Sequence, residues 1–395
     1  MKLTTTVKIK LYTDNKSNEE FKAVTEMYSS VCNEVSKYAF ETDQMKVTLS
    51  SLHDQVYYNI RDRLKSQMAC SVSRSVLSAY KTVETQLKDN PLIIKEKGKT
   101  YTHKRDLGWL RKPIEFKKPF VDLVRGRDWS FVKDGEEVKL SINTLNKREV
   151  VSFNHHFDDI LFDKDVKLGT AKLINKNGTW YLHISITKEY EDTKEANKII
   201  GADRGLRFVL TLFDGETTKF INGQDIAKIR KRFHDTRKSL QKKNTRGSRR
   251  VLKRISGREN RWMNDVNHCL SKTLVSEPNS LIVFEDLTNI SFETSKGKDF
   301  NRELSSWSFY DLEQKTIYKA KMNGVEVVKV PARYTSQRCP LCGHIHKENR
   351  QKDKHLFVCR KCGYTSNDDR IGAMNLYELG KRYLETGKLQ GFSKQ

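Results

Sequence analysis

The stretch 197-NKIIGADRGLRFVLTLFDG-215 consists of two apolar runs joined by a turn that carries one acid, Asp203, between Gly201 and Gly205. Short runs rich in Ile, Val, Leu and Phe and bounded by glycine predict two β strands. A single aspartate in such a turn is ordinary. It becomes informative only if acids from distant parts of the chain fold beside it, so the rest of the sequence decides its meaning.

The charge of the chain is its strongest bulk property. Among 395 residues, 74 are Lys or Arg and 50 are Asp or Glu, so the formal net charge is +24 and a polyanionic partner such as nucleic acid is predicted. An acidic membrane is the weaker alternative, because the sequence shows no apolar signal segment and no run of membrane-spanning length. We expect no membrane partner and a soluble, intracellular protein.

The N-terminal half predicts a strand, then helices, then more strands. Residues 1–16 alternate between apolar and polar, whereas residues 17–88 carry apolar residues at three- and four-residue spacings, which indicates a small helical bundle. After Pro91, short apolar runs broken by Gly, Pro and Asn indicate a β domain, with Asn177 and Gly178 at the preferred turn positions of a hairpin. We expect the first strand to complete this domain across the helical insertion.

The C-terminal half alternates strands with helices, which predicts a mixed α/β sheet. The apolar run SLIVFEDL at 280–287 indicates a strand, followed by a helix within 306–324 and a strand within 325–335. Residues 230–261 form a basic helical segment with 14 Lys or Arg and two acids. Because this charge has one sign, contact with phosphates is favoured over the alternative of a solvated helix face.

Four of the seven cysteines form two C-x-x-C pairs, Cys339 with Cys342 and Cys359 with Cys362, separated by 16 residues. Zinc binds thiolates at tetrahedral corners, and each C-x-x-C turn supplies two of them. Since all four positions are filled by sulfur, we predict one structural zinc ion. A pair of reduced redox motifs is the less favoured alternative. The histidines between the pairs are expected at the surface rather than on the metal: His344, His346 and His355.

Two further acids stand at the ends of predicted elements. Glu285 ends the strand SLIVFEDL, and Asp369 lies at the start of the helix NDDRIGAMNL. Each has a plain alternative: Glu285 is solvated while Asp286 caps a turn, and Asp369 favours the helix dipole while Asn367 or Asp368 caps the helix.

The three acids together are more specific than any one of them. Two acids at strand ends and one at a helix start are how an RNase H-like sheet assembles a magnesium site, because magnesium prefers oxygen ligands. Two such ions would activate the attacking water and stabilise the leaving oxygen. Asp203 would then be a metal ligand that is isolated in the sequence but not in the fold.

Several segments together resemble one family. GADRG, IVFEDL, RYTSQRCPLCG with CRKCG, and NDDRIGAMNL are similar, in this order, to the RuvC motifs and zinc ribbon of the TnpB family. These are transposon-encoded RNA-guided DNA nucleases related to compact type V CRISPR effectors. The resemblance covers roughly residues 197–380, and KIKLY and KSQMACSVSRSVLSAYK resemble, less specifically, the family's opening strand and recognition helix.

The resemblance implies a multidomain α+β fold. A helical recognition lobe would be inserted in a β-barrel wedge domain, followed by an RNase H-like (RuvC) α/β nuclease domain with an inserted zinc ribbon. The implied boundaries are 1–16 and 89–196 for the wedge domain, 17–88 for the recognition domain, 197–334 and 367–395 for the nuclease domain, and 335–366 for the ribbon.

By the same resemblance, Asp203, Glu285 and Asp369 are the catalytic acids that hold two magnesium ions, with Asp368 a rival for the third position. The sequence departs from the family pattern at Arg204, where an apolar residue usually follows the first acid. This departure bears on the local packing rather than on the metal ligands.

The implied function is that of an RNA-guided DNA endonuclease. The protein would bind a guide RNA as a monomer or homodimer, recognise a short motif beside a double-stranded DNA target, and cleave after an RNA–DNA heteroduplex forms. The candidate nucleic-acid contacts are Lys65, Gln67, Ser71, Arg74, Arg230, Lys231, Arg237, Lys242, Lys243, Arg249 and Arg250. For the first four, an ordinary exposed helix face is an equal alternative. Trp109, Trp129 and Trp180 are expected in the core rather than stacked on bases.

Other functions stay open at this point. A nuclease-inactive RNA-guided DNA-binding repressor is disfavoured by the three intact acids, and a DNA-joining transposase would need strand transfer as well as cleavage. The sequence does not separate a transposon-encoded nuclease from a compact type V CRISPR effector.

Overall fold

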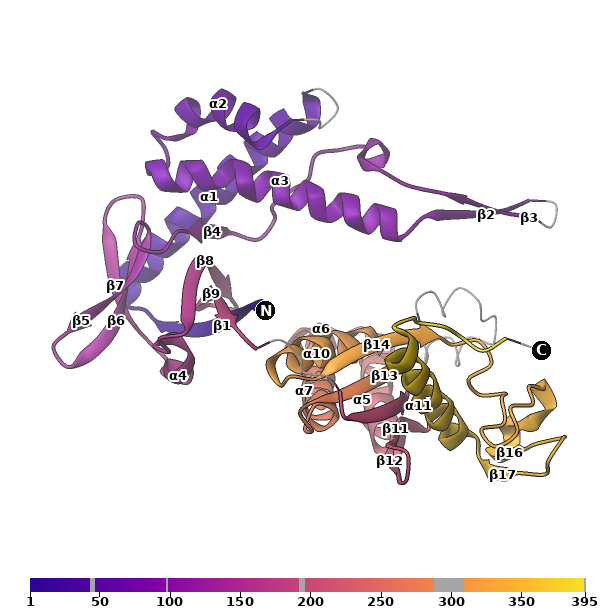
Figure 1. Ribbon diagram of the computed structural model, residues 1–395. Coiled ribbons are helices and arrows are strands. Elements are labelled where there is room, and N and C mark those ends of the chain that lie inside the picture. The colour runs from indigo at the N-terminus through magenta and orange to yellow at the C-terminus, as the bar shows by residue number, and fades with distance from the viewer. Residues whose placement is uncertain (43–46, 97–98, 192–195, 288–308, 394–395) are drawn as a thin grey trace. The chain divides into compact units, whose positions relative to one another are not determined.

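The structure is a computed structural model that describes residues 1–42, 47–96, 99–191, 196–287 and 309–393. The chain divides into two compact units, Lys2–Glu189 and a unit made of Met1 with Tyr190–Gln395, whose elements are labelled in Figure 1. No helix in the described part of the chain is long and apolar enough to cross a membrane.

The first unit contains a seven-stranded antiparallel sheet in the order β4-β8-β9-β1-β7-β6-β5. Strand β1 joins its two halves, because Lys2 to Lys10 pair with β9 and the last two residues pair with β7. The strands are β1 (Lys2–Tyr12), β4 (Phe120–Leu123), β5 (Trp129–Asp134), β6 (Glu137–Asn143), β7 (Arg148–Phe153), β8 (Val166–Lys176) and β9 (Thr179–Glu189). A closed barrel is not found, since no pairing joins the outer strands β4 and β5 within the residues described for this unit.

The hairpin between β8 and β9 has the predicted turn. Asn177 and Gly178 adopt φ angles of 54° and 85°, the left-handed region that a two-residue hairpin turn requires at both positions. A second, two-stranded hairpin is formed by β2 (Leu92–Glu96) and β3 (Lys99–His103).

Three helices confirm the helical prediction for the segment after the first strand: α1 (Asn15–Glu41), α2 (Leu49–Ile60) and α3 (Ser66–Asp89). The Asp14 side chain starts α1 by accepting a hydrogen bond from the Ser17 backbone N–H at 2.7 Å. The apolar faces of the helices share one hydrophobic core with the sheet. The division of this unit into recognition and wedge domains therefore does not coincide with two separate cores, and it stays a prediction.

Two of the three tryptophans of this unit lie where they were predicted. Trp129 and Trp180 are buried in the shared core. Trp109 is 51% exposed, so its predicted core position is wrong. It ends the short 3-10 helix η2 (Leu107–Trp109), in which Leu107 and the following Leu110 pack against the core and leave Trp109 on the outside.

The second unit contains a mixed sheet, as the alternation of strands and helices predicted, and this sheet has five strands. Its order is β12-β11-β10-β13-β14, with β10, β11 and β12 antiparallel and with β13 and β14 parallel to β10. The strands are β10 (Lys198–Asp203), β11 (Phe208–Phe213), β12 (Thr218–Asn222), β13 (Ser280–Asp286) and β14 (Glu326–Pro331).

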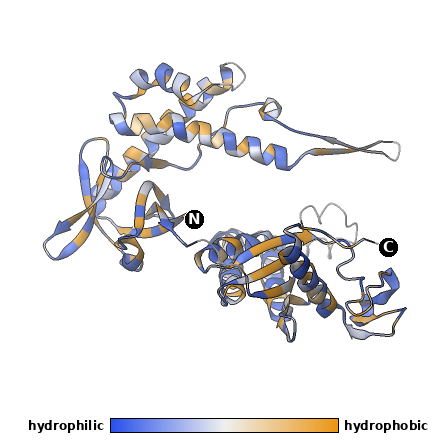
Figure 2. Ribbon diagram, in the orientation of Figure 1, coloured by the Kyte–Doolittle hydropathy of each residue, from blue (hydrophilic) through white to orange (hydrophobic). Residues whose placement is uncertain are grey.

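Helices cover both faces of this sheet, which explains why SLIVF is apolar without alternation. Leu281 and Val283 of β13 pack with α11, whereas Ile282 and Phe284 pack in a core with α7 and α10. Hydrophobic residues, coloured orange in Figure 2, accordingly gather on the strands of this sheet. The helices of the unit are α5 (Gln224–Lys243), α6 (Arg246–Ile255), α7 (Arg258–Leu274), α10 (Phe309–Met322) and α11 (Asp368–Thr386).

Between β14 and α11 the chain forms the cysteine-rich segment and a small three-stranded sheet of β15 (Arg350–Gln351), β16 (Leu356–Val358) and β17 (Thr365–Asn367). Strand β17 runs directly into α11, because Asp368 follows Asn367 without a linker. The segment with the cysteines is thus fixed to the first turn of the helix that carries Asp369.

Candidate functional site

The register of two parallel strands places Asp203 beside Glu285. On β10 and β13, Ala202 pairs with Phe284, so Asp203 and Glu285 follow at the next step. Ala202 and Phe284 point into the core shared with α7 and α10. Since successive side chains of a strand point to opposite faces, both acids face the side of the sheet that α11 covers.

Helix α11 brings Asp369 to the same face. The Asn367 side chain caps this helix by accepting hydrogen bonds from the backbone N–H groups of Asp369 and Arg370, at 3.0 and 3.2 Å. Of the two predicted cap residues it is therefore Asn367, not Asp368, that fills this role. One turn on, a Cβ atom at Gly372 would lie 3.0 Å from the Asp203 carboxylate carbon, so the helix backbone packs directly on that acid.

Burial raises the pKa of all three acids. Burial, followed by the negative charges of Glu285 and Asp369, raises the pKa of Asp203 well above its ordinary value. Burial also raises the pKa of Glu285. It raises the pKa of Asp369 as well, and the negative charge of the neighbouring Asp368 raises that pKa further. Carboxylates that stay this close in partial burial gain free energy from a bound cation.

The spacing and the unused oxygen atoms of the acids indicate which cation fits. Among the described residues, Asp203, Glu285 and Asp369 do not offer three ligand atoms that all lie within 4.8 Å of one another. Opposite ligands of one magnesium ion are only about 4 Å apart, so the three side chains, as they are placed, do not form the ready-made ligand set of a single ion.

One of these carboxylates has an oxygen atom that no donor satisfies. Asp369 Oδ2 is buried, and no described residue donates a hydrogen bond to it. Free carboxylate oxygens of this kind are the ligands that hard divalent cations prefer. The donor set therefore has the chemistry of a divalent-cation site.

Asp368, the rival for the third position, is engaged elsewhere. It is 2% exposed, and its Oδ2 accepts a hydrogen bond from Arg350 Nε of β15 at 2.9 Å. Its other oxygen lies 3.8 Å from His355 Nδ1. The side chains of His355, Asp368 and Asp369 form a group whose ligand atoms lie within 4.8 Å of one another, although His355 is exposed as predicted.

Sequence analysis missed Arg350. It pairs with Asp368, its Nη2 lies 3.9 Å from Asp369 Oδ1, and its charge lowers the pKa of all three candidate catalytic acids. Nothing in the surrounding sequence KENRQKDK distinguishes this arginine from its basic neighbours. Its role becomes visible only once the three-stranded sheet is folded against α11.

The departure at Arg204 is explained by a buried ion pair. The Arg204 side chain is 1% exposed and donates to Glu313 Oε2 of α10 at 3.0 Å. It also donates to the main-chain carbonyl of Glu285, and its guanidinium lies 4.6 Å from the centre of the Phe284 ring. The position usually filled by an apolar residue therefore holds a cation that pairs with Glu313 of α10 and donates to the end of β13, while its Nε is buried without a partner among the described residues.

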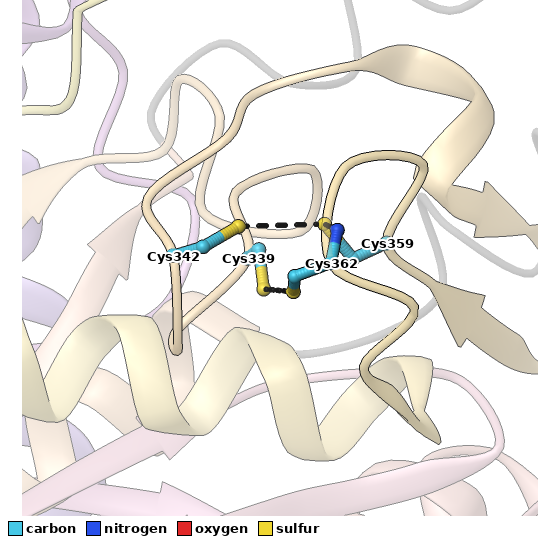
Figure 3. A group of neighbouring side chains, drawn as sticks. All are labelled: Cys339, Cys342, Cys359 and Cys362. Carbon is cyan, nitrogen blue, oxygen red and sulfur yellow. Dashed lines mark hydrogen bonds between the residues drawn. The ribbon is translucent and has the colours of Figure 1, made fainter.

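The four predicted cysteines meet in one cluster. The sulfur atoms of Cys339 and Cys362 are 3.7 Å apart and those of Cys342 and Cys359 are 3.5 Å apart, as the dashed lines in Figure 3 show. All four lie within 4.8 Å of one another. Tetrahedral zinc with Zn–S bonds of about 2.3 Å requires sulfur atoms about 3.8 Å apart, so the spacing fits zinc.

Backbone groups favour the thiolate of one of the four cysteines, Cys359. Burial alone would raise the pKa of Cys359, but the N–H groups of Cys362 and Lys361 point at its sulfur and lower that pKa to about 7. The glycines after the two pairs, Gly343 and Gly363, have φ angles of 75° and 74°. A side chain there would be strained, which explains the glycine in both C-x-x-C-G motifs.

The predicted contacts on α3 differ in exposure. Arg74 is exposed, and Lys65 and Gln67 are half-buried, with Lys65 Nζ donating to Asn143 Oδ1 at 2.7 Å. Ser71 is 4% exposed and its hydroxyl donates to the main-chain carbonyl of Gln67. The structure thus leaves Arg74 as the most accessible of the four and places Ser71 in the interior.

The basic segment forms α5, α6 and the start of α7. Arg230 and Arg237 both pair with Glu259, and the Arg230 side chain is 16% exposed. These two arginines therefore hold α5 against α7. The other candidates in the segment are exposed: Lys231, Lys242, Lys243, Arg249 and Arg250.

Two family profiles match the chain. The profile described as "Probable transposase" matches residues 182–289, and the profile described as "Cas12f1-like, TNB domain" matches residues 309–376. The first match ends just after Glu285, and the second contains the four cysteines and Asp369.

Curated relatives extend this similarity. The chain is 26% identical over 356 residues to the CRISPR-associated endodeoxyribonuclease Cas12f1 of Sulfoacidibacillus thermotolerans, which covers 83% of this chain and 81% of the relative. It is 30% identical over 231 residues to the putative RNA-guided DNA endonuclease InsQ of Escherichia coli (54% of this chain, 56% of the relative). It is 34% identical over 160 residues to the TnpB-like protein MJ0751 of Methanocaldococcus jannaschii (39% and 56%). The chain thus spans most of the first relative and about half of the other two.

Solved structures support the fold. The protein in a Cas12f1–sgRNA–target DNA complex matches with a TM-score of 0.60 at 15% identity, covering 95% of this chain and 99% of that one. The mini-RNA-guided endonuclease CRISPR-Cas_phi3 matches with a TM-score of 0.56 at 12% identity, covering 99% and 94%. Similarity at this level of identity shows a shared fold.

Proposed function

We propose that this chain, a relative of the TnpB-like proteins and the Cas12f1 endonucleases, is an RNA-guided DNA endonuclease. The observation that carries the proposal is the placement of Asp203, Glu285 and Asp369 on one face of the mixed sheet, with each carboxyl influenced by negative neighbours or burial. Its relatives are named as nucleases, and this chain keeps the acids that such chemistry needs.

The fold supports the finer assignment of domains. The sheet order β12-β11-β10-β13-β14, with three antiparallel strands followed by two parallel ones, is what we expect for the RNase H-like nuclease domain at 197–334 and 367–395. The cysteine cluster supports a zinc ribbon at 335–366. A recognition domain at 17–88 and a wedge domain at 1–16 and 89–196, with a barrel-like sheet, complete the proposal.

The proposed catalytic centre holds two magnesium ions on Asp203, Glu285 and Asp369. When bound, these ions supply an activated water for attack on the scissile phosphate and charge stabilisation for the leaving oxygen. The protein fixes the three carboxylates on β10, β13 and α11, and Gly372 leaves room for Asp203. One zinc ion on the four cysteines would have a structural role, since no ligand position is left open.

The proposed partners are a guide RNA, a double-stranded DNA target and the RNA–DNA heteroduplex that they form. The net charge of +24 and the exposed cations of α5 and α6 support these partners, because neutralising phosphates is the main source of affinity for nucleic acid. Of the α3 residues, Arg74 is the best-placed candidate for the duplex motif. A monomer or a homodimer on each RNA, in the cytoplasm of a prokaryotic cell, completes this proposal.

The experiment is to express the chain with the DNA that flanks its gene, isolate the complex with the RNA that copurifies, and incubate it with DNA matching that RNA. We expect cleavage in Mg²⁺ and none in EDTA. Asp203→Ala should abolish cleavage and retain binding of the RNA, whereas Asp225→Ala, an exposed acid on α5, should cleave normally. Cleavage by Asp203→Ala at the normal rate would overturn the assignment of the catalytic centre.

A further inference from the structure

We propose that Thr335 and Arg204 are positioning residues that together fix the carboxylate of Glu285 for metal binding. This inference rests on the proposed function, because it concerns how the protein aims one of the proposed metal ligands. Neither residue belongs to the three acids, and neither was predicted as part of the site from the sequence.

Thr335 holds the side chain of Glu285. It is 1% exposed, and its hydroxyl donates to Glu285 Oε1 and also lies 2.8 Å from the main-chain carbonyl of Ala332. A hydroxyl has one hydrogen, and an ionised carboxylate is the stronger acceptor of the two. Thr335 therefore occupies Oε1 when Glu285 is charged, which leaves Oε2 free to bind a cation.

Thr335 is itself fixed to the helix that carries Asp369. The Asn375 side chain of α11 is fully buried, and its Nδ2 donates to the main-chain carbonyls of Thr335 at 2.7 Å and Arg338 at 2.8 Å. The direction of Glu285 is thus tied through Thr335 to α11. Two buried residues, Thr335 and Asn375, thus link Glu285 by hydrogen bonds to the helix that carries Asp369.

Arg204 holds the backbone of Glu285 from the other end. Its guanidinium donates to the Glu285 carbonyl while Glu313 accepts from the same guanidinium, and Lys329 lies 3.2 Å from the second oxygen of Glu313. Arg204 directly follows Asp203 in the sequence. One planar side chain therefore connects the end of β10 to the end of β13, where the two neighbouring acids lie.

The arrangement predicts a specific effect on metal affinity. Residues that hold a metal ligand through a hydrogen bond typically change metal affinity or activity by about 10- to 100-fold when they are replaced. Removing the Thr335 hydroxyl should release the Glu285 carboxylate from its fixed direction while leaving the side-chain volume nearly unchanged. The loss should appear in metal binding before any nucleic acid is present.

The experiment measures Mn²⁺ binding to the full chain by electron paramagnetic resonance of free Mn²⁺, in Thr335→Val, Thr335→Ser and Arg204→Lys. Thr335→Val should weaken the Asp203-dependent Mn²⁺ site about 10-fold, and Thr335→Ser, which keeps the hydroxyl, should restore most of the affinity. Arg204→Lys keeps the charge but loses the planar fork and should weaken the same site. The matched control is Thr316→Val, since Thr316 is fully buried in the same unit and donates to a backbone carbonyl of α10. Thermal unfolding without metal is measured for every variant.

The outcomes separate this inference from the proposed function. If Mn²⁺ binding to the unmodified chain does not depend on Asp203, the proposed catalytic centre is wrong. If it does depend on Asp203 but Thr335→Val binds Mn²⁺ as tightly as the unmodified chain, the positioning role is overturned while the centre stands. Equal losses in Thr335→Ser and Thr335→Val, or in Thr316→Val, would likewise overturn it, because packing rather than the hydroxyl would be responsible.

Discussion

The backbone of α11 at Gly372 lies against the carboxylate of Asp203, so that a Cβ atom there would be 3.0 Å from its Cγ and from Oδ2. This contact brings the first turn of α11, with Asp369, onto the end of β10. A glycine in the middle of a helix costs up to about 1 kcal/mol relative to alanine. Here the close approach to an acid explains why a glycine is present.

We therefore expect Gly372→Ala to impair metal binding and DNA cleavage by at least about 10-fold without unfolding the protein. The added methyl group must displace the Asp203 carboxylate by a few tenths of an ångström, while the helix gains intrinsic stability. Gly247→Ala is the matched control, because Gly247 lies in α6 with only the Thr245 side chain near its Cβ position, at 4.0 Å. Cleavage rates and melting temperatures of the two variants check this, and an unchanged rate in Gly372→Ala would show that the contact has no role.

Asp203→Asn should stabilise the metal-free protein while abolishing cleavage. Burial and the charges of Glu285 and Asp369 raise the pKa of Asp203, so its ionised form is unfavourable in the folded state. Removing that charge should raise the free energy of unfolding by about 1 kcal/mol, the size of a common stabilising substitution. Urea unfolding in EDTA measures the difference, and a less stable Asp203→Asn variant would contradict the electrostatic account.

The same shifts predict a pH dependence. A carboxyl whose folded pKa is raised binds more protons in the folded state than in the unfolded state between its ordinary and its raised pKa. The contribution of Asp203, Glu285 and Asp369 to stability is therefore present at low pH and is lost as pH rises through their raised values. In EDTA, the difference in unfolding free energy between Asp203→Asn and the unmodified chain should grow with pH above the ordinary Asp value of 3.8. A difference that shrinks over this range would have the wrong sign.

Loss of the cysteine cluster should affect the acids as well as the ribbon. Strand β17 runs directly into α11, and Arg350 of the same small sheet pairs with Asp368. We expect Cys362→Ser to lower zinc content, lower the melting temperature and reduce cleavage at saturating Mg²⁺. Cys269→Ser is the control, since Cys269 is an exposed cysteine on α7 outside the cluster. Metal analysis by mass spectrometry checks the zinc content. Full cleavage activity in zinc-free protein would show that the cysteine cluster does not affect the three acids.

Within the basic segment, exposed and paired cations should behave differently. Lys242→Ala with Lys243→Ala should weaken RNA binding and reduce the slope of log affinity against log salt by roughly one to two, one unit for each lost phosphate contact. Arg230→Ala should instead lower stability, because Arg230 is largely buried against Glu259, and it should leave the salt slope nearly unchanged. Titrations with the copurified RNA at several salt concentrations distinguish the two cases, and equal salt slopes would contradict the distinction.

Local sequence patterns predicted the elements that carry the acids and the cysteines. SLIVFED reads as a strand buried on both faces, and Asn367 together with the helix after it carries a standard cap signal, so the positions of Glu285 and Asp369 at element ends could be inferred. The paired C-x-x-C spacing likewise predicted the cluster of four sulfur atoms. In each case, the information lies within a few neighbouring residues.

The residues that sequence analysis missed depend on contacts between distant segments. The contact of Thr335 with Glu285 joins residues 50 positions apart in the sequence. The contact of Arg350 with Asp368 spans 18 positions, and that of Glu313 with Arg204 spans 109. The exposure of Trp109 was also missed, because a tryptophan in a short turn follows no periodic pattern. Arg204 was noticed as a departure, but its buried ion pair with α10 could not be read from its neighbours.

The central claim is that Asp203, Glu285 and Asp369 hold a pair of divalent ions. The most direct measurement is anomalous X-ray diffraction from crystals of the protein prepared in Mn²⁺. We expect two anomalous peaks about 3.5–4 Å apart, in contact with the carboxylates of these three residues. Manganese bound at His355 and Asp368 without Asp203 and Glu285, or no manganese on the α11 face of the sheet, would contradict it.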